Sequence, residues 1–260
     1  MPQPSAHRAD TFLLPGVAEA YRARPPYPPE VIDRLIDLAG GGRVLDLGAG
    51  EGSIARRLVG RVSSVVAVER SAPMIEVGRA LPGGTDVTWH CEAAETFTAP
   101  GPFDLAVVGE AMHWFDLPAV MIRLHDVLRE GRPLALVDRS VRHARMPEVV
   151  EVIKRFSRAI DYDPTYDVAD DLTDRGLWVR VGEVVPTVTL VRQSSQAYLE
   201  SLHSTSSLAR ALMTPEENAA FDAAVLETLR PITDSDGMLT LDVTARLVWG
   251  SVRSQSVENA

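Results

Sequence analysis

The first half of the chain alternates short apolar runs with stretches of helical spacing, and this alternation restricts the possible folds more than any other feature. The candidate strands are residues 43–48, 64–69, 86–91, 103–109 and 133–139. Strands that alternate with helices form βαβ units, in which helices cover both faces of a mostly parallel sheet. The sequence therefore predicts an α/β fold.

The pattern changes in the second half of the chain, where helical spacing dominates. Residues 147–160 predict one helix, and residues 214–230 predict another that begins with the capping-box sequence Thr-Pro-Glu-Glu. Residues 184–192 are a candidate strand, and residues 239–249 alternate apolar and polar side chains with the period of two that is typical of a strand. An Asp-rich stretch at 161–174 is expected to be a loop.

These patterns divide the chain into three parts. Residues 1–142 are expected to form an N-terminal segment and the α/β core, which would hold a cofactor. Residues 143–237 are expected to form a largely helical cap that contributes one strand to the core sheet. Residues 238–260 are expected to supply the final core strand and a tail. A chain of 260 residues is long enough for such a domain with an elaboration.

Composition argues against several classes of function. The formal charge of −10 disfavours a nucleic-acid partner, because such proteins need Lys and Arg to neutralise phosphates. The single cysteine and the six histidines, which show no paired ligand spacing, indicate no metal site. No apolar run approaches the roughly 20 residues of a membrane helix, and the N-terminus lacks the pattern of a signal peptide. We therefore expect a cytoplasmic protein without a membrane partner. Lys154 is the only lysine, a usage typical of GC-rich bacterial genomes.

The first candidate strand runs into a glycine-rich turn, VLDLGAGEGS. Gly48, Gly50 and Gly52 allow a tight turn and a close approach of the backbone to a ligand, and the N–H groups of a following helix favour a nucleotide-like cofactor. The dinucleotide fingerprint requires glycine where Ser53 stands, which weakens an NAD interpretation. Glu69 follows Gly50 by 19 residues, close to the spacing at which an acid meets ribose hydroxyls.

Four segments occur in a characteristic order: VLDLGAGEG, VVAVERSAPMI, the Ala-Ala-Glu at 93–95 before FDLAVV, and GEAMHWF. Together they resemble the class I S-adenosylmethionine-dependent methyltransferases, in particular the small-molecule type related to ubiquinone and trans-aconitate methyltransferases. The resemblance covers nearly the whole chain. It implies a Rossmann-like seven-stranded sheet, mostly parallel with an antiparallel last strand, plus a helical cap. It also implies methyl transfer to an oxygen, nitrogen or carbon atom of a small molecule, such as a natural-product intermediate.

The resemblance further implies which residues contact the cofactor, S-adenosyl-L-methionine. It puts the glycine loop at the methionine end, Glu69 on both ribose hydroxyls, and Arg70 and Met74 beside the adenine. The implied set is Tyr21, Arg24, Asp46, Gly48, Ala49, Gly50, Glu69, Arg70, Met74, Ala93, Ala94, Glu95 and Glu110. The family often has Asp at the position of Ala93, so backbone contacts or Glu95 would have to replace an aspartate bond to the adenine.

The stretch YRARPPYPPE at residues 21–30 contains Pro-Pro-Tyr, which carries catalysis in DNA adenine methyltransferases when Asn or Asp precedes it. Here Arg24 precedes it, and a guanidinium cannot accept a hydrogen bond from the amino group of a base, so we reject that interpretation. The family that the chain resembles often carries a tyrosine and Arg-Pro-x-Tyr-Pro at this place. The resemblance implies that residues 21–27 close over the cofactor with Arg24 near its carboxylate; the alternative is a lead-in segment that only packs.

The fourth candidate strand is followed by GEAMHWFD, at the edge of a parallel sheet where ligands gather. His113 is the candidate catalytic residue, either as a general base, as a contact that orients the acceptor, or as a packing residue. The candidate substrate-binding residues are Tyr27, Trp114, Tyr162, Tyr166, Tyr198 and His203, with Trp178 as a further candidate aromatic. For His203, packing on a cap helix is the favoured interpretation.

Methyl transfer from a sulfonium is an in-line displacement, so alignment of the reactants and exclusion of water can supply most of the acceleration. A base matters chiefly for hydroxyl or carbon acceptors. Two alternatives stay open at this point: a protein that binds S-adenosylmethionine without catalysis, and a nicotinamide-dependent oxidoreductase. The HWF segment and the displaced glycine disfavour the second.

Overall fold

The computed structural model of the chain describes residues 6–158, 165–185 and 187–254. Its centre is one sheet with the strand order β3-β2-β1-β4-β5-β8-β6, and β7 also pairs with β8. The strands are β1 (Arg43–Leu47), β2 (Ser64–Glu69), β3 (Thr88–Cys91), β4 (Leu105–Gly109), β5 (Leu134–Arg142), β6 (Trp178–Val184), β7 (Thr189–Ser194) and β8 (Met238–Val252). β8 runs antiparallel to its neighbours, whereas the pairs among β1 to β5 are parallel. The predicted Rossmann-like, mostly parallel α/β fold is confirmed, but the sheet has eight strands among the described residues instead of the expected seven.

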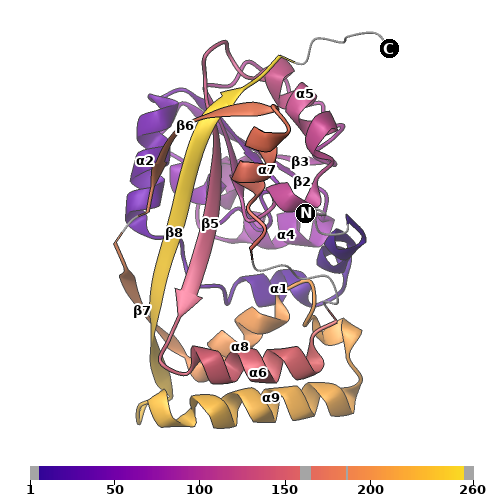
Figure 1. Ribbon diagram of the computed structural model, residues 1–260, viewed down its shortest axis with the longest axis vertical. Helices are drawn as coiled ribbons and strands as arrows, with labels where there is room; N and C mark the ends of the chain where they lie inside the picture. Colours follow the sequence, from indigo (N-terminus) through magenta and orange to yellow (C-terminus); the bar gives the residue numbers. More distant parts are fainter. Residues whose placement is uncertain (1–5, 159–164, 186, 255–260) are drawn as a thin grey trace.

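The 15-residue strand β8 is shared by two shorter strands on the side away from β5. β6 pairs with the C-terminal part of β8, from Leu247 to Val252, and β7 pairs with its N-terminal part, from Met238 to Val243. Figure 1 shows β6 and β7 near opposite ends of the long yellow strand. The expectation of one core strand between residues 143 and 237 is therefore wrong, because this part of the chain contributes both β6 and β7 to the sheet.

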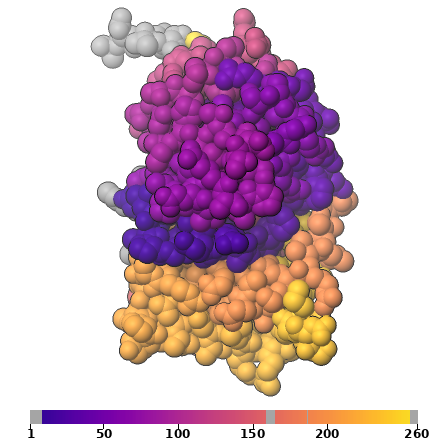
Figure 2. Space-filling model, turned by 180° about the vertical axis from the view of Figure 1, so that it is seen from behind, coloured from indigo at the N-terminus to yellow at the C-terminus, as the bar shows by residue number. Residues whose placement is uncertain are grey.

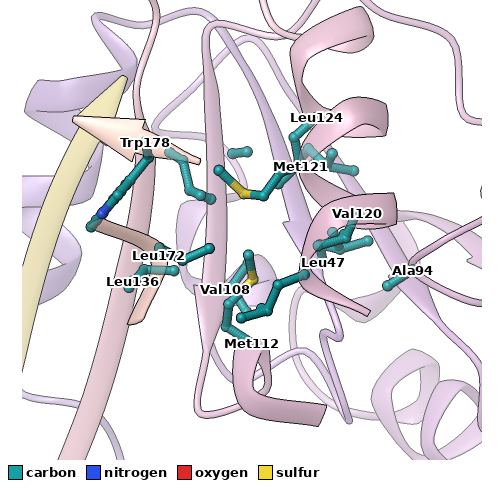
Figure 3. Close-up of a cluster of buried hydrophobic side chains, with 14 of the residues drawn as sticks. Leu47, Ala94, Val108, Met112, Val120, Met121, Leu124, Leu136, Leu172 and Trp178 are labelled. Atoms are coloured by element: carbon teal, nitrogen blue, oxygen red, sulfur yellow. The ribbon is translucent and has the colours of Figure 1, made fainter. Parts of the chain in front are cut away.

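Helices cover both faces of the sheet in the core. They are α1 (Val17–Tyr21), α2 (Pro29–Ala39), α3 (Ala55–Leu58), α4 (Ala72–Ala80), α5 (Leu117–Val127), α6 (Met146–Phe156), α7 (Val168–Asp174), α8 (Ser195–His203) and α9 (Pro215–Leu229), with 3₁₀ turns η1 (Ala6–Leu13), η2 (Gly84–Asp86), η3 (Met112–Trp114), η4 (Arg210–Leu212) and η5 (Arg230–Ile232). Side chains of α2 and α3 pack with one face, and side chains of α5 and α7 pack with the other. Figure 3 shows part of the second cluster, in which Met112, Leu136 and Leu172 meet from three elements.

The cap consists of α6, α8 and α9, which lie together at the N-terminal end of β8 (Figure 1). The predicted capping box is present, because Thr214 Oγ1 accepts from the Glu217 N–H and Glu217 accepts from the Thr214 N–H. Part of the expected Asp-rich loop is helix α7, since Asp167 Oδ1 caps it by accepting from two backbone N–H groups. Local hydrogen bonding by aspartate explains this difference.

Two kinds of feature are absent from the described residues. No helix within them combines the length and apolarity needed to cross a membrane. They also contain no group of three or more His, Cys, Asp or Glu side chains arranged to hold a metal ion.

Candidate active site

The glycine loop after β1 brings the backbone close to its surroundings. Gly48 has a φ of 69°, in the left-handed region that favours glycine. A Cβ at this position would lie 2.7 Å from Ala111 Cβ and 2.8 Å from Phe115 Cζ. The N–H groups of Gly48 and Ala49 donate to the Val68 carbonyl, at 2.9 and 3.1 Å. The loop is thus held against β2, and only glycine fits at position 48.

Glu69, at the end of β2, is buried beneath this loop. Its Oε2 accepts from the Gly50 N–H at 2.8 Å, and its Oε1 accepts from the Ser71 N–H at 2.8 Å. Burial raises the pKa of Glu69, and the backbone N–H groups oppose that rise. A carboxylate has about four acceptor positions. Glu69 is therefore held in place with acceptor capacity left for a ligand.

A main cavity of about 450 Å³ lies over the C-terminal ends of β1, β2 and β4. This volume falls in the range of small-molecule sites, about 300–1,000 Å³. The cavity brings together most of the side chains and backbone atoms proposed from the sequence: Tyr21, Arg24, Tyr27, Gly48, Ala49, Gly50, Glu69, Arg70, Met74, Ala93, Ala94, Glu95, Glu110 and Trp114. Further lining residues that the sequence did not single out include Phe12, Phe115 and Arg139.

Asp46 is the exception among the residues proposed to bind the cofactor. It is buried behind the glycine loop and does not line the main cavity. Its Oδ2 accepts from the Ala55 N–H at 2.9 Å, at the start of α3. Burial raises the pKa of Asp46 to about 7, against the opposing effect of that N–H. In this structure Asp46 supports the loop from behind.

Glu110 organises the polar end of the main cavity. It has a φ of 54°, which is uncommon for a residue with a side chain. Glu110 Oε2 accepts from Arg24 Nη1 at 3.1 Å and from Arg139 Nη2 at 2.9 Å, and Oε1 accepts from the Arg139 N–H at 3.2 Å. Each guanidinium also lies over an aromatic ring, Arg24 over Tyr21 at 3.9 Å and Arg139 over Tyr27 at 4.6 Å. The Glu110 carboxylate, just after β4, thus joins the middle of β5 to the N-terminal segment.

Arg24 also reaches the cap. Its Nε donates to Ser204 Oγ at 2.7 Å, and its Nη2 donates to the Ser204 carbonyl at 3.1 Å. Arg139 Nη1 donates to the Pro25 carbonyl. Arg139 could have been found from the sequence, because it is a charged residue directly after the apolar part of the fifth strand, where ligands of a parallel sheet bind. Its pairing with Glu110 depends on the adjacency of β4 and β5.

His113 does not line the main cavity, although the next residue, Trp114, does. The two rings lie 4.4 Å apart between centroids. His113 instead lines a second cavity of about 230 Å³ with Asp138, Tyr166, Asp167, Val168 and Arg246. Burial lowers the pKa of His113 to about 4, against the opposing effect of Glu110. The imidazole is therefore neutral at pH 7.

The remaining proposed substrate contacts that the structure describes do not line the main cavity. Tyr166 lines the second cavity and donates to Asp171 Oδ2 at 3.0 Å. Tyr162 lies outside the described residues. Trp178 is buried on β6, where its Nε1 donates to the Ala169 carbonyl at 3.1 Å.

Two of these proposed contacts are instead part of the core of the cap. Tyr198 is buried beside His143, with Tyr198 Oη 2.9 Å from His143 Nε2. His203 is buried and bonds the Leu208 carbonyl and Asp222 Oδ1, both at 2.8 Å. Neither Tyr198 nor His203 lines a described cavity, so the structure does not support substrate contact by either residue. For His203, the favoured packing interpretation agrees with these contacts.

Comparison with known proteins agrees with this geometry. Residues 44–131 match the methyltransferase domain family. An uncharacterized methyltransferase of Mycobacterium tuberculosis is 40% identical over 164 residues, which are 62% of this chain and 65% of that protein. The chain thus spans about 65% of the length of the curated relatives that it matches first.

Solved structures have the same fold. A structure from Anaeromyxobacter dehalogenans, named a candidate type II methyltransferase, is 26% identical with a TM-score of 0.59, over 88% of this chain and 97% of that one. A phosphoethanolamine N-methyltransferase of Haemonchus contortus, solved with S-adenosylhomocysteine, is 15% identical with a TM-score of 0.52, over 95% of this chain and 59% of that one. The latter similarity concerns the fold alone.

Proposed function

We propose that this chain, in which residues 44–131 match the methyltransferase domain family, transfers a methyl group from S-adenosylmethionine to a small-molecule acceptor. The observation that carries the proposal is the main cavity, in which a tight glycine loop faces the buried carboxylate of Glu69. The proposal covers oxygen, nitrogen and carbon acceptors.

The residues of the main cavity fit this cofactor. The acceptor positions of Glu69 that Gly50 and Ser71 leave open suit the two ribose hydroxyls. The missing side chain at Gly48 keeps the loop close to Ala111 and leaves room above it for a ligand. Bound there, S-adenosylmethionine supplies a methyl group on a positively charged sulfur atom, which is the electrophile of the reaction.

The N-terminal segment would hold the carboxylate end of the cofactor. Arg24 lines the main cavity and is paired with Glu110. Its guanidinium has several N–H donors, so it can bind a ligand carboxylate while it keeps the bond to Glu110. The rings of Tyr21 and Tyr27, beneath Arg24 and Arg139, exclude water from that end. Exclusion of water and alignment of the acceptor are the main catalytic contributions that this chain would make.

His113 would contact the acceptor from the second cavity. Its lowered pKa leaves a neutral imidazole at pH 7, which can accept or donate one hydrogen bond. Residues 166–168, which belong to the part of the chain expected to form the cap, line the same cavity as His113. We propose that this part of the chain selects the acceptor.

Two alternatives make different predictions. A protein that binds the cofactor without catalysis would retain Glu69 and the glycine loop, and would form no methylated product. A nicotinamide-dependent oxidoreductase would bind NAD in the same cavity. Ser53 in place of the third glycine of the dinucleotide fingerprint disfavours the oxidoreductase.

A thermal-shift experiment separates these possibilities. We expect S-adenosylmethionine and S-adenosylhomocysteine to raise the melting temperature, while NAD and NADP leave it unchanged. A ligand at a hundredfold excess over its Kd stabilises the folded state by about 2.7 kcal/mol. Glu69→Gln should weaken S-adenosylhomocysteine binding at least about tenfold, since bonds to a charged acceptor contribute roughly 1.5–3 kcal/mol each. The exposed Glu76→Gln on α4 is the matched control. A shift with NAD alone would contradict the proposal.

A further inference from the structure

Asp138 lines the second cavity, and its carboxylate accepts no hydrogen bond from any other residue that the structure describes. We propose that this cavity, termed the Asp138 cavity and lined by His113, Asp138, Tyr166, Asp167, Val168 and Arg246, anchors the acceptor by a cationic group such as a protonated amine held by Asp138. The inference rests on the proposed function and narrows it to a substrate class. The anchored cation is distinct from the atom that receives the methyl group.

Strand geometry aims Asp138 into this cavity. Side chains two residues apart on a strand share a face, so Asp138 points to the same side of β5 as Leu136. Figure 3 shows Leu136 next to Leu172 in the buried cluster on that face, to which Met112 also belongs. Met112 immediately precedes His113 on η3. Close packing of these apolar neighbours fixes the backbone on which Asp138 and His113 sit.

The other charged groups of the Asp138 cavity have partners within the fold. Arg246, which stands opposite Asp138 in the β5–β8 pair, donates to Asp167 and to Glu183. Asp167 also caps α7. The Tyr166 hydroxyl donates to Asp171. Among the described residues, none donates a hydrogen bond to the Asp138 carboxylate. Asp138 is thus the acidic group of the cavity with acceptor capacity for a ligand.

The charge balance favours a cation over an anion. Asp138 and Asp167 contribute two negative charges against the one positive charge of Arg246, and His113 is neutral at pH 7. Asp138 is an exposed residue, yet the protein packed around its carboxylate displaces water and raises its pKa to about 6. The negative charges of Glu110 and Asp167 add to that rise. A cation bound at Asp138 would relieve this repulsion, whereas an anion would increase it.

Consecutive residues line the two cavities, just after β4 and in the middle of β5. Asp138 faces the Asp138 cavity, and the next residue, Arg139, lines the main cavity. Likewise, His113 lines the Asp138 cavity and the next residue, Trp114, lines the main cavity, and their rings are in contact. An acceptor held by its cationic group at Asp138 would have to pass the ring pair of His113 and Trp114 to reach the main cavity.

The test uses two small probes of similar shape and opposite charge, benzylammonium and benzoate. Binding is measured by ligand-observed NMR on the full chain saturated with S-adenosylhomocysteine. We expect benzylammonium to bind more tightly than benzoate, and Asp138→Asn to weaken benzylammonium at least about tenfold. Asp170→Asn is the matched control, because Asp170 is an exposed acid on α7 outside the cavity and its loss changes the net charge equally.

Equal binding of the two probes, or equal effects of the two variants, would overturn the inference. If Asp138→Asn does not fold, the pH dependence of benzylammonium binding to the natural sequence decides instead. Affinity should fall as the pH drops through about 6, where Asp138 protonates. The groups that face Asp138 are His113, Tyr166, Asp167 and Arg246, with Glu110 nearby. Unchanged affinity between pH 7.5 and 5 would sink the idea. Failure of S-adenosylhomocysteine itself to bind would instead contradict the proposed function.

Discussion

At the scale of single residues, Gly48 combines a left-handed backbone with a close contact, and the two effects can be separated. Gly60 has a similar φ of 74°, but a Cβ there would meet nothing within 4 Å. Both Gly48→Ala and Gly60→Ala should lose about 1–2 kcal/mol of unfolding free energy from backbone strain. Only Gly48→Ala should also displace Ala111 or Phe115, which line the main cavity.

We therefore expect Gly48→Ala to lose additional stability and to bind S-adenosylhomocysteine more weakly than Gly60→Ala does. Chemical denaturation and calorimetric titration measure the two quantities. Equal affinities in the two variants would mean that the close approach at Gly48 has no part in cofactor binding.

A second prediction at this scale concerns His113 and pH. Its pKa of about 4 in the folded protein lies below the ordinary 6.5, so the unfolded chain binds a proton at higher pH than the folded chain does. The stability contributed by neutral His113 is complete above pH 6.5 and is lost as the pH falls towards 4. His113→Asn should reduce the loss of melting temperature between pH 7 and 4.5.

The exposed His125→Asn is the control for this measurement. Asp138 acts in the opposite direction, because its raised pKa makes the folded state gain stability as the pH falls through 6, and it is present in both variants. If both variants lose as much melting temperature on acidification as the natural sequence, His113 is not held neutral by burial. An acidic limb of activity due to His113 would lie near pH 4.

The sequence identified residues whose role follows from local pattern and missed those whose role follows from strand order. Glu69 could be predicted from its spacing to the glycine loop, and the structure bonds it to Gly50. Arg139 and Asp138 sit on a strand that reads as apolar, and their neighbours come from β4, β8 and α7. The position of His113 after β4 was predictable, but not the side of the sheet edge that its ring faces.

At the scale of elements, β6 shows where periodicity fails. Trp178 is buried at its start, but most of the following side chains are exposed, so the strand lacks both an apolar run and a clean alternation. Its pairing comes from the free edge of β8. By contrast, β8 alternates over most of its length, and the sequence alone predicted it to within a few residues of its bounds.

At the scale of the whole molecule, the N-terminal segment lies between core and cap and bonds to both. Figure 2 shows this indigo segment as a band between the magenta core and the orange cap. Arg24 bonds Ser204 after α8, Gln193 Nε2 donates to the Ala23 carbonyl, and Thr11 Oγ1 donates to the Ser206 carbonyl at 3.2 Å. Because Arg24 also lines the main cavity, a ligand there should affect the cap through this segment.

Hydrogen exchange can measure this coupling. We expect S-adenosylhomocysteine to slow amide exchange in the glycine loop, in residues 17–28 and in α8. Arg24→Gln should retain slowing in the glycine loop and lose it in α8. Arg79→Gln is the control, because Arg79 is exposed on α4 and does not line the main cavity. Slowing in α8 that persists in Arg24→Gln would show that another route connects the cavity to the cap.

Strand β8 limits how the molecule can move. Its N-terminal residues pack with the helices of the cap, through Leu239, Leu241 and Val243, whereas Leu247 and Val248 pack in the two clusters of the core. The two regions therefore share one continuous strand. A rotation of the cap away from the core would have to break hydrogen bonds of the sheet along β8. A cap transplanted from another protein would therefore have to bring its own half of this strand.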